Sequence, residues 1–171
     1  NPEPLYDIVD FFEIGEGEEM MNDVLEVYAR HKANGKVNKK EFLREISQIG
    51  GIYVPSLYDV TYNEDGTIKE FKPKYEDVPA KVKKRIVNNF DAVAFPDEMI
   101  VPYTDIVHDR VVLETARGCT NGCRFCQAGM IYRPIREKSV DRLKEIVDKL
   151  IKSTGYDEIS LSSLSTSDYS K

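Results

Sequence analysis

The first 50 residues have the hydrophobic and polar pattern of a short strand followed by helices. A short apolar run at residues 11–14 precedes a Gly-Glu-Gly-Glu segment at 15–18, and apolar residues then recur at helical spacing over 20–28. Residues 33–35, Ala-Asn-Gly, provide a stop signal. This pattern predicts a strand, a glycine turn and a helix. A second helix is predicted over about 39–48, where the apolar residues fall on one face.

The middle of the chain carries the signals of a β-hairpin. Residues 58–62 and 67–71 alternate between apolar and polar side chains, and the intervening Asn-Glu-Asp-Gly at 63–66 has the composition of a turn. The segment 79–86 begins with proline and contains four basic residues, which predicts a short basic helix. Residues 95–103 contain two prolines and predict an extended connector.

The pattern changes after His108. Residues 110–115 have an apolar centre, as expected for a strand of a buried parallel sheet, and residues 158–162 predict a second strand. Between them, Ser139 is positioned to cap a helix that ends at Thr154-Gly155. The expected buried stripe of that helix consists of Val140, Leu143, Ile146, Val147, Leu150 and Ile151. Strand, long loop, helix and strand form one βαβ unit.

Composition adds general limits. The 171 residues have 41% apolar content and a net charge of −6, which is ordinary for a globular protein and gives no support for nucleic-acid binding by the whole chain. The sequence contains no apolar run long enough for a membrane span and no signal-peptide pattern. We expect a piece of a longer protein, because the chain starts with Asn1. We expect a reducing, cytoplasmic location, because three clustered cysteines are not a disulfide framework.

The charge is distributed unevenly. From Glu3 to Glu26 there are nine acidic residues and no Lys or Arg. Between Arg110 and Lys144 three acidic residues accompany eight basic ones: Arg110, Arg117, Arg124, Arg133, Arg136, Lys138, Arg142 and Lys144. Positive charge around the cysteines would suit an anionic ligand or an electron donor with an acidic face. A solvated helix face explains Arg142 and Lys144 equally well.

All three cysteines lie within eight residues, spaced C-x3-C-x2-C, as Cys119, Cys123 and Cys126. Structural zinc sites and ordinary [4Fe–4S] clusters take four protein ligands. Three cysteines therefore leave one coordination position open for a substrate or cofactor, which indicates a reactive site. The loop begins beyond the carboxyl end of the first predicted strand, where α/β barrels build their active sites. Gly118 and Gly122 would allow it to fold tightly.

Two other uses of these cysteines remain open. The first is a zinc-binding module whose fourth ligand is His108 or an outside group, although knuckle-like zinc sites usually arrange their ligands as two close pairs. The second is a dithiol redox site formed by Cys123 and Cys126, which leaves Cys119 without a role.

The cysteine spacing resembles the C-x3-C-x-aromatic-C signature of the radical S-adenosylmethionine (SAM) superfamily. The wider run HDRVVLETARGCTNGCRFCQAGMIYRPIREKS is similar to the group with an N-terminal cobalamin (B12)-binding-type domain, and FFEIGEGEE at 11–19 is similar to the end of such a domain. The resemblance implies an α/β fold, in which a partial (β/α) TIM barrel follows the tail of a Rossmann-like domain and a small hairpin connector. The implied domains are residues 1–50, 51–105 and 106–171.

The resemblance also implies a function. The three cysteines would ligate a [4Fe–4S] cluster that reductively cleaves SAM to a 5′-deoxyadenosyl radical, and Phe125 would lie near the adenine. The electron donor would be a flavodoxin or ferredoxin, and the substrate an unidentified RNA, peptide or small molecule. The Gly-Gly-Glu motif of the family is replaced by the serine-rich run 162–167, in which Ser163 and Ser165 are candidates to contact SAM. The cobalt-ligating Asp-x-His-x-x-Gly motif is absent, which leaves cobalamin binding open.

Overall fold

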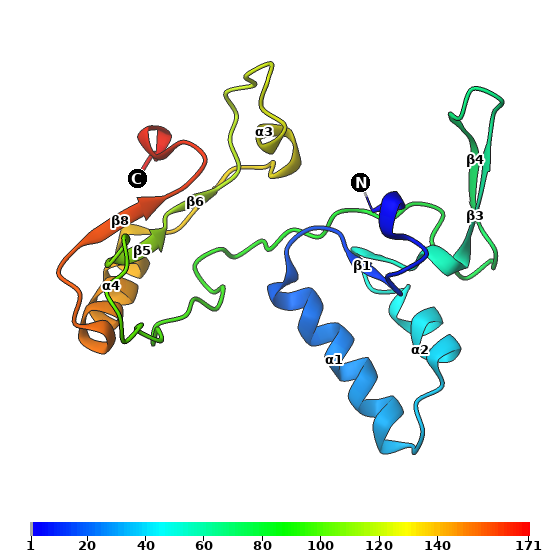
Figure 1. Cartoon of the computed structure of the whole chain (residues 1–171), viewed down its shortest axis with the longest axis horizontal. Coiled ribbons are helices and arrows are strands. Elements are labelled where there is room, and N and C mark those ends of the chain that lie inside the picture. Colours follow the sequence, from blue (N-terminus) through cyan, green and yellow to red (C-terminus); the bar gives the residue numbers. More distant parts are fainter. Residues whose placement is uncertain (1) are drawn as a thin grey trace. The chain divides into compact units, whose positions relative to one another are not determined.

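A computed structural model describes residues 2–171 and divides the chain into two compact units. The first unit ends at Val87, and the second runs from Asn88 to Lys171 (Figure 1). Each unit has a hydrophobic core of its own. Within the described residues no helix combines the length and apolar composition that a membrane span requires.

The first unit is built on a pair of helices and a two-stranded sheet. Helix α1 (Gly17–Ala33) and helix α2 (Lys39–Ile46) confirm the two predicted helices, and the Asn38 side chain caps α2 by accepting the Lys40 N–H. Strand β1 (Phe12–Glu13), the predicted first strand, pairs antiparallel with β2 (Ile52–Tyr53). The core of the unit contains Met20, Val24, Val27, Leu43, Ile46, Ile52, Tyr53, Val54, Leu57, Tyr58 and Val78.

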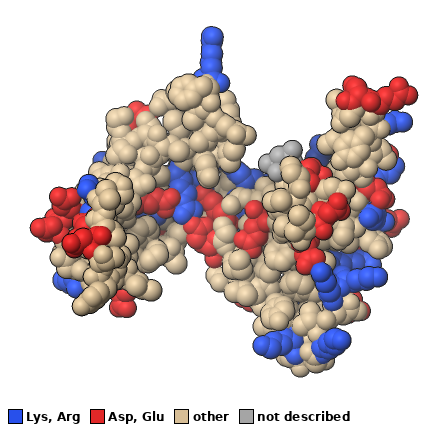
Figure 2. All heavy atoms as spheres, in the orientation of Figure 1, with Lys and Arg blue, Asp and Glu red and all other residues tan. Residues whose placement is uncertain are grey.

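The predicted hairpin is confirmed. Strand β3 (Tyr58–Tyr62) pairs antiparallel with β4 (Ile68–Pro73), and the intervening turn has acidic side chains at its tip (Figures 1 and 2). At the base of the hairpin the rings of Tyr58 and Phe71 stack with centroids 4.7 Å apart. This stacking joins β4 to the core, because Tyr58 is a core residue.

The prediction of a basic helix over 79–86 is wrong, because Arg85 in this segment pairs with the backbone of residues 14–16 instead. Arg85 N–H donates to the Ile14 carbonyl at 2.9 Å, and Glu16 N–H donates to the Arg85 carbonyl at 3.1 Å. Gly15 lies between these contacts with φ +122°, and a Cβ there would lie 2.1 Å from the Arg85 carbonyl oxygen. The glycine therefore permits a close approach of two backbone segments.

The second unit contains the predicted βαβ arrangement. Strands β5 (Val111–Glu114) and β8 (Ile159–Ser162) are parallel and are connected through helix α4 (Val140–Thr154). The Ser139 hydroxyl accepts the Arg142 N–H at 3.2 Å, and Gly155 ends the helix with φ +74°, so both predicted caps are confirmed. A parallel strand–helix–strand repeat is the building block of β/α barrels, so the second unit has the fold type of a partial β/α barrel.

Only one face of the parallel pair is covered. Val111 and Leu113 are buried against Ile146 and Leu150 of α4. Val112 alternates to the opposite face and is 44% exposed, so the expectation of a strand buried on both faces is wrong for this chain. On β8, Leu161 is the register partner of Leu113 and lies on the α4 side, yet it is 57% exposed. The predicted stripe of α4 is also narrower than expected, with Val140 and Ile151 exposed at its two ends.

Candidate functional site

The three cysteines lie on a long loop that is closed at its base. The cysteine loop, residues 118–135, connects β6 (Ala116–Arg117) to β7 (Arg136–Glu137) and contains one short helix, α3 (Ala128–Ile131). Strands β6 and β7 pair antiparallel, so the two ends of the loop are adjacent (Figure 1). The loop starts just beyond the carboxyl end of β5, as the sequence predicted.

Gly118 and Gly122 give the loop its shape. Both have positive φ, +90° at Gly118 and +66° at Gly122, a region that other residues rarely adopt. A Cβ at Gly118 would lie 2.5 Å from the carbonyl oxygen of Pro134 and 2.7 Å from that of Tyr132. At Gly122 a Cβ would meet nothing nearer than 3.9 Å. The base of the loop is therefore backbone packed on backbone, whereas the turn at Gly122 is open.

A buried cation lies under the base of the loop. Lys138 is fully buried, and its Nζ lies 3.3 Å from the centroid of the Phe90 ring and 3.9 Å from the Glu114 carboxylate. Glu114 also accepts two hydrogen bonds from the Arg117 guanidinium, at 2.7 and 3.0 Å. The Tyr169 hydroxyl donates to the Lys138 carbonyl at 2.7 Å. These contacts join the end of β5 to the two strands of the base.

Several of the basic residues predicted to surround the cysteines are engaged by contacts within the unit. Arg110 pairs with Glu158 at 3.5 Å, and Arg142 pairs with Glu145 at 3.1 Å. Arg136 donates to the Pro134 and Tyr132 carbonyls of its own loop. Among the described residues, the exposed Arg124 next to Cys123 has no hydrogen-bond or ion-pair partner. Arg124 is thus the guanidinium of this set that is available to an outside group.

The cysteines themselves are free thiols. Cys119 and Cys126 are half-buried, Cys123 is exposed, and the Cys126 N–H donates to the Cys123 carbonyl at 3.1 Å. Within residues 2–171 no three His, Cys, Asp or Glu side chains are gathered into a group that would hold a metal ion. The structure therefore places all three thiols on one loop without bringing them together at one point. As a donor set, three unpaired cysteines on a glycine-containing loop fit a cluster with three protein thiolates.

Phe125 extends from the loop and is 93% exposed. It packs against no core residue of the second unit. Its predicted position beside an adenine ring stays a prediction, as does cluster ligation by the three cysteines.

The serine loop, residues 163–168 after β8, is tied to the cysteine loop. Asn121 Nδ2 donates to the Asp168 carboxylate at 2.7 Å and lies 3.4 Å from the Ser165 hydroxyl, which itself donates to Asp168 at 2.8 Å. The hydroxyl of Ser165 and the amide of Asn121 hold the pKa of Asp168 below its usual range. No local pattern indicated a role for Asn121, because its partner Asp168 lies 47 positions away in the chain.

A pocket of about 350 Å³ opens where the parallel strands end. Glu114 contributes from the end of β5, Ser162 and Ser163 from the end of β8, and Gly118 and Tyr132 from the cysteine loop. The complete lining is Glu114, Ala116, Arg117, Gly118, Tyr132, Ser162, Ser163 and Leu164. Of the two predicted serine contacts, Ser163 therefore lines the pocket, while Ser165 is engaged by Asp168. The volume is sufficient for a small organic ligand or for part of a larger one.

Comparison with known proteins gives two family matches. A family model described as "Radical SAM proteins, N-terminal" matches residues 1–55, which contain β1, α1, α2 and β2. A model described as "Radical SAM superfamily" matches residues 113–171, which contain the cysteine loop, α4 and β8.

An uncharacterized protein of Methanocaldococcus jannaschii is 36% identical to this chain over 58 residues. The alignment covers 34% of this chain and 13% of that protein, so the chain spans a small part of its relative's length. No solved structure matches the chain. The two family matches agree with each other and each covers part of one unit, and the second contains the three free cysteines, which follow the end of a parallel strand. Both matched regions of the chain therefore belong to the radical SAM superfamily.

Proposed function

We propose that this chain is part of an enzyme in which Cys119, Cys123 and Cys126 ligate a [4Fe–4S] cluster. Reductive cleavage of SAM would then produce a 5′-deoxyadenosyl radical that acts on an unidentified substrate. One observation carries the proposal: all three free thiols lie on a single closed loop beyond the carboxyl end of β5, beside the pocket where β5 and β8 end. In α/β barrels this end of the strands holds the active site.

When bound, the cluster would supply one electron to the sulfonium of SAM. SAM would bind through its amino and carboxylate groups to the iron atom that has no protein ligand. The protein's share of the work is to bind, orient and shield. The β6–β7 pair holds the two ends of the cysteine loop together, which limits the space available to the three thiols. The fixed Glu114–Arg117 pair and the Ser163 hydroxyl offer polar contacts at the pocket wall.

Further parts of the proposal rest on the family resemblance. Phe125 is proposed to pack on the adenine, which would cover a ring that is 93% exposed. A flavodoxin- or ferredoxin-type donor is proposed to approach the exposed Arg124, since both classes of donor are acidic. Residues 1–50 are proposed to be the tail of a cobalamin-binding-type domain, and cobalamin is a candidate second cofactor. A reducing cytoplasm is the proposed location, because it would keep the exposed thiol of Cys123 reduced.

Anaerobic reconstitution of the chain with iron and sulfide tests cluster binding. We expect a brown protein with about four iron atoms per chain, because a [4Fe–4S] cluster contains four. Cys119→Ala, Cys123→Ala and Cys126→Ala should each lose most of the bound iron, and Ser165→Ala, as the matched control on the neighbouring loop, should keep it.

The alternative functions predict different outcomes. A colourless product with one zinc per chain would replace the proposal by a zinc-binding module. Full dithiol exchange activity in Cys119→Ala would support a redox site formed by Cys123 and Cys126. The reaction itself is tested on the protein that contains this chain, by measuring 5′-deoxyadenosine after addition of SAM and a reductant. A filled cluster that produces none would refute the proposed chemistry while leaving cluster binding in place.

A further inference from the structure

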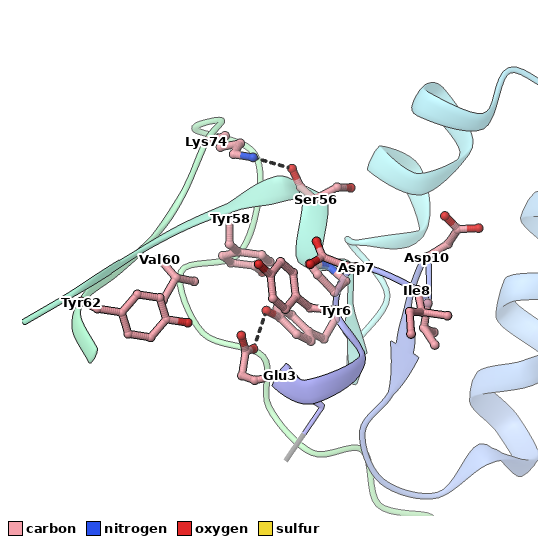
Figure 3. Close-up of a pocket in the computed structure, with 13 residues that line it drawn as sticks. Glu3, Tyr6, Asp7, Ile8, Asp10, Ser56, Tyr58, Val60, Tyr62 and Lys74 are labelled. Atoms are coloured by element: carbon pink, nitrogen blue, oxygen red, sulfur yellow. Dashed lines mark hydrogen bonds between the residues drawn. The ribbon is translucent and has the colours of Figure 1, made fainter. Parts of the chain in front are cut away.

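A second pocket lies in the first unit, far along the sequence from the cysteines. Its volume is about 430 Å³, within the range of small-molecule sites. Four tyrosines line it, Tyr6, Tyr53, Tyr58 and Tyr62, together with three carboxylates and one lysine (Figure 3). The charged residues in the wall are Glu3, Asp7, Asp10 and Lys74.

Two of the tyrosines form a fixed floor. Tyr53 and Tyr58 are 6% and 5% exposed, and their ring centroids are 5.4 Å apart. The Tyr53 hydroxyl donates to the Glu3 carboxylate at 2.8 Å, and the Tyr58 hydroxyl donates to the Pro79 carbonyl at 2.8 Å. Burial, followed by the Glu3 carboxylate, raises the pKa of Tyr53 well above its ordinary value. Both rings are therefore held in place, and their hydroxyl groups already have partners.

The other two tyrosines leave ring surface open. Tyr6 and Tyr62 are 51% and 53% exposed, although both line the pocket. In Figure 3 the side chain of Tyr6 lies next to that of Tyr58, and Tyr62 lies toward the other end of the pocket. A ring face carries negative potential, so it attracts a cation and gives little to an anion.

The charged groups have the same preference. Asp10 is paired with Lys39 at 2.6 Å, and Lys74 lies 3.7 Å from Asp59. Among the described residues, no Lys or Arg pairs with Asp7, whose carboxylate raises the pKa of the neighbouring Tyr6. The Asp7 carboxylate is therefore hydrogen-bonded to the Tyr6 side chain, is paired with no Lys or Arg of the described residues, and lies next to open ring surface.

We propose that this pocket binds a small organic cation of the alkylammonium class, with the charged nitrogen against the ring of Tyr6 and near the Asp7 carboxylate and the rest of the ligand extending toward Tyr62. An ammonium group gains both from the ring faces and from the carboxylate, whereas an anion would be repelled and a neutral group would gain neither contribution. The assignment is independent of the cysteine loop, because every residue of the pocket belongs to the first unit. The same chemistry is offered by a free alkylamine and by a lysine side chain of a polypeptide.

Titration of the whole chain with choline, followed by NMR of carbon-13-labelled tyrosine rings, tests the proposal. We expect the ring signals of Tyr6, Tyr58 and Tyr62 to shift together with one dissociation constant. The rings of Tyr28 and Tyr103, which lie outside the pocket, should not move. The uncharged isostere of choline, dimethylbutanol, should bind about tenfold more weakly, since it retains the shape and loses the charge.

Substitutions make the test specific. Asp7→Asn and Tyr62→Leu should each weaken choline binding about threefold, while Tyr103→Leu, a fully exposed tyrosine of the second unit, should leave it unchanged. Nα-acetyl-lysine amide, if bound more tightly than choline, would identify a polypeptide lysine as the source of the cation; tighter choline binding would identify a free alkylammonium ion. Equal binding of choline and dimethylbutanol would overturn the proposal. Unchanged binding by both pocket variants, with the tyrosine signals still dispersed as in the unmodified chain, would overturn it as well.

Discussion

Replacing Gly118 by alanine tests how the base of the cysteine loop is built. Gly118 has φ +90°, and a Cβ there would lie 2.5 Å and 2.7 Å from two carbonyl oxygens and 2.9 Å from the Ile135 Cα. The unfavourable backbone conformation costs about 1–2 kcal/mol, and displacement of well-packed backbone costs about 1–3 kcal/mol more. We therefore expect Gly118→Ala to lower the free energy of unfolding of the second unit by about 2–5 kcal/mol.

Gly122→Ala is the matched control, because it shares the positive φ but a Cβ there would meet nothing within 3.9 Å. It should cost only the backbone term of about 1–2 kcal/mol. Urea unfolding followed by far-UV circular dichroism gives the two free energies, and hydrogen exchange over residues 111–137 shows whether the loss is located at the β6–β7 pair. Equal costs for the two variants would refute the close packing at Gly118, as would a Gly118→Ala variant with unchanged exchange at the base.

Two further predictions concern contacts that hold the second unit together. The Ser139 N–H donates to the Asp91 carboxylate at 2.7 Å, which lowers the pKa of Asp91. Asp91→Asn should therefore cost about 1 kcal/mol at neutral pH, measured by urea unfolding. The pKa of Asp91 is lower in the folded state than in the unfolded state, so the unfolded state binds more protons. The difference in unfolding free energy between Asp91→Asn and the unmodified chain should therefore shrink as pH falls below about 4. A difference that persists in acid would contradict this assignment. Asn121→Ala removes the hydrogen bond to Asp168 and should raise the rate of proteolytic cleavage in the cysteine loop up to about fivefold. Asn22→Ala, which removes an exposed hydrogen bond within α1, should leave that rate unchanged, and equal rates in Asn121→Ala and the unmodified chain would show that the tie does not hold the loop.

The elements that could be predicted from the sequence are those whose stabilising contacts are local. Helix α4 was predicted with both caps, because Ser139 and Gly155 act on backbone groups within a few residues. The hairpin was predicted because its turn residues and its alternation are adjacent in the sequence. The cysteine spacing also lies within a single loop, so its chemistry could be inferred without knowledge of the fold.

The features that were missed depend on distant partners. The segment 79–86 has a helical composition, but its backbone groups pair with residues 14–16, which no local pattern encodes. Lys138 was counted among the basic residues around the cysteines, yet it is fully buried over Phe90, 48 positions earlier in the chain. Strands β6 and β7 contain two residues each, too few for a periodic signal.

The pairing between the two ends of the first unit has a consequence for the order of folding. Helices α1 and α2 depend on local hydrogen bonds and form from a continuous stretch of chain. The contact of the Val87 N–H with the Glu16 carboxylate joins residues 71 positions apart, and the Gly15–Arg85 bridge spans nearly as many. During synthesis from the N-terminus, the helices are therefore available long before Val87 emerges from the ribosome. The first unit cannot complete its fold until residues 85–87 have been synthesised. Until then, the backbone around Gly15 lacks the partner that it has in the folded state.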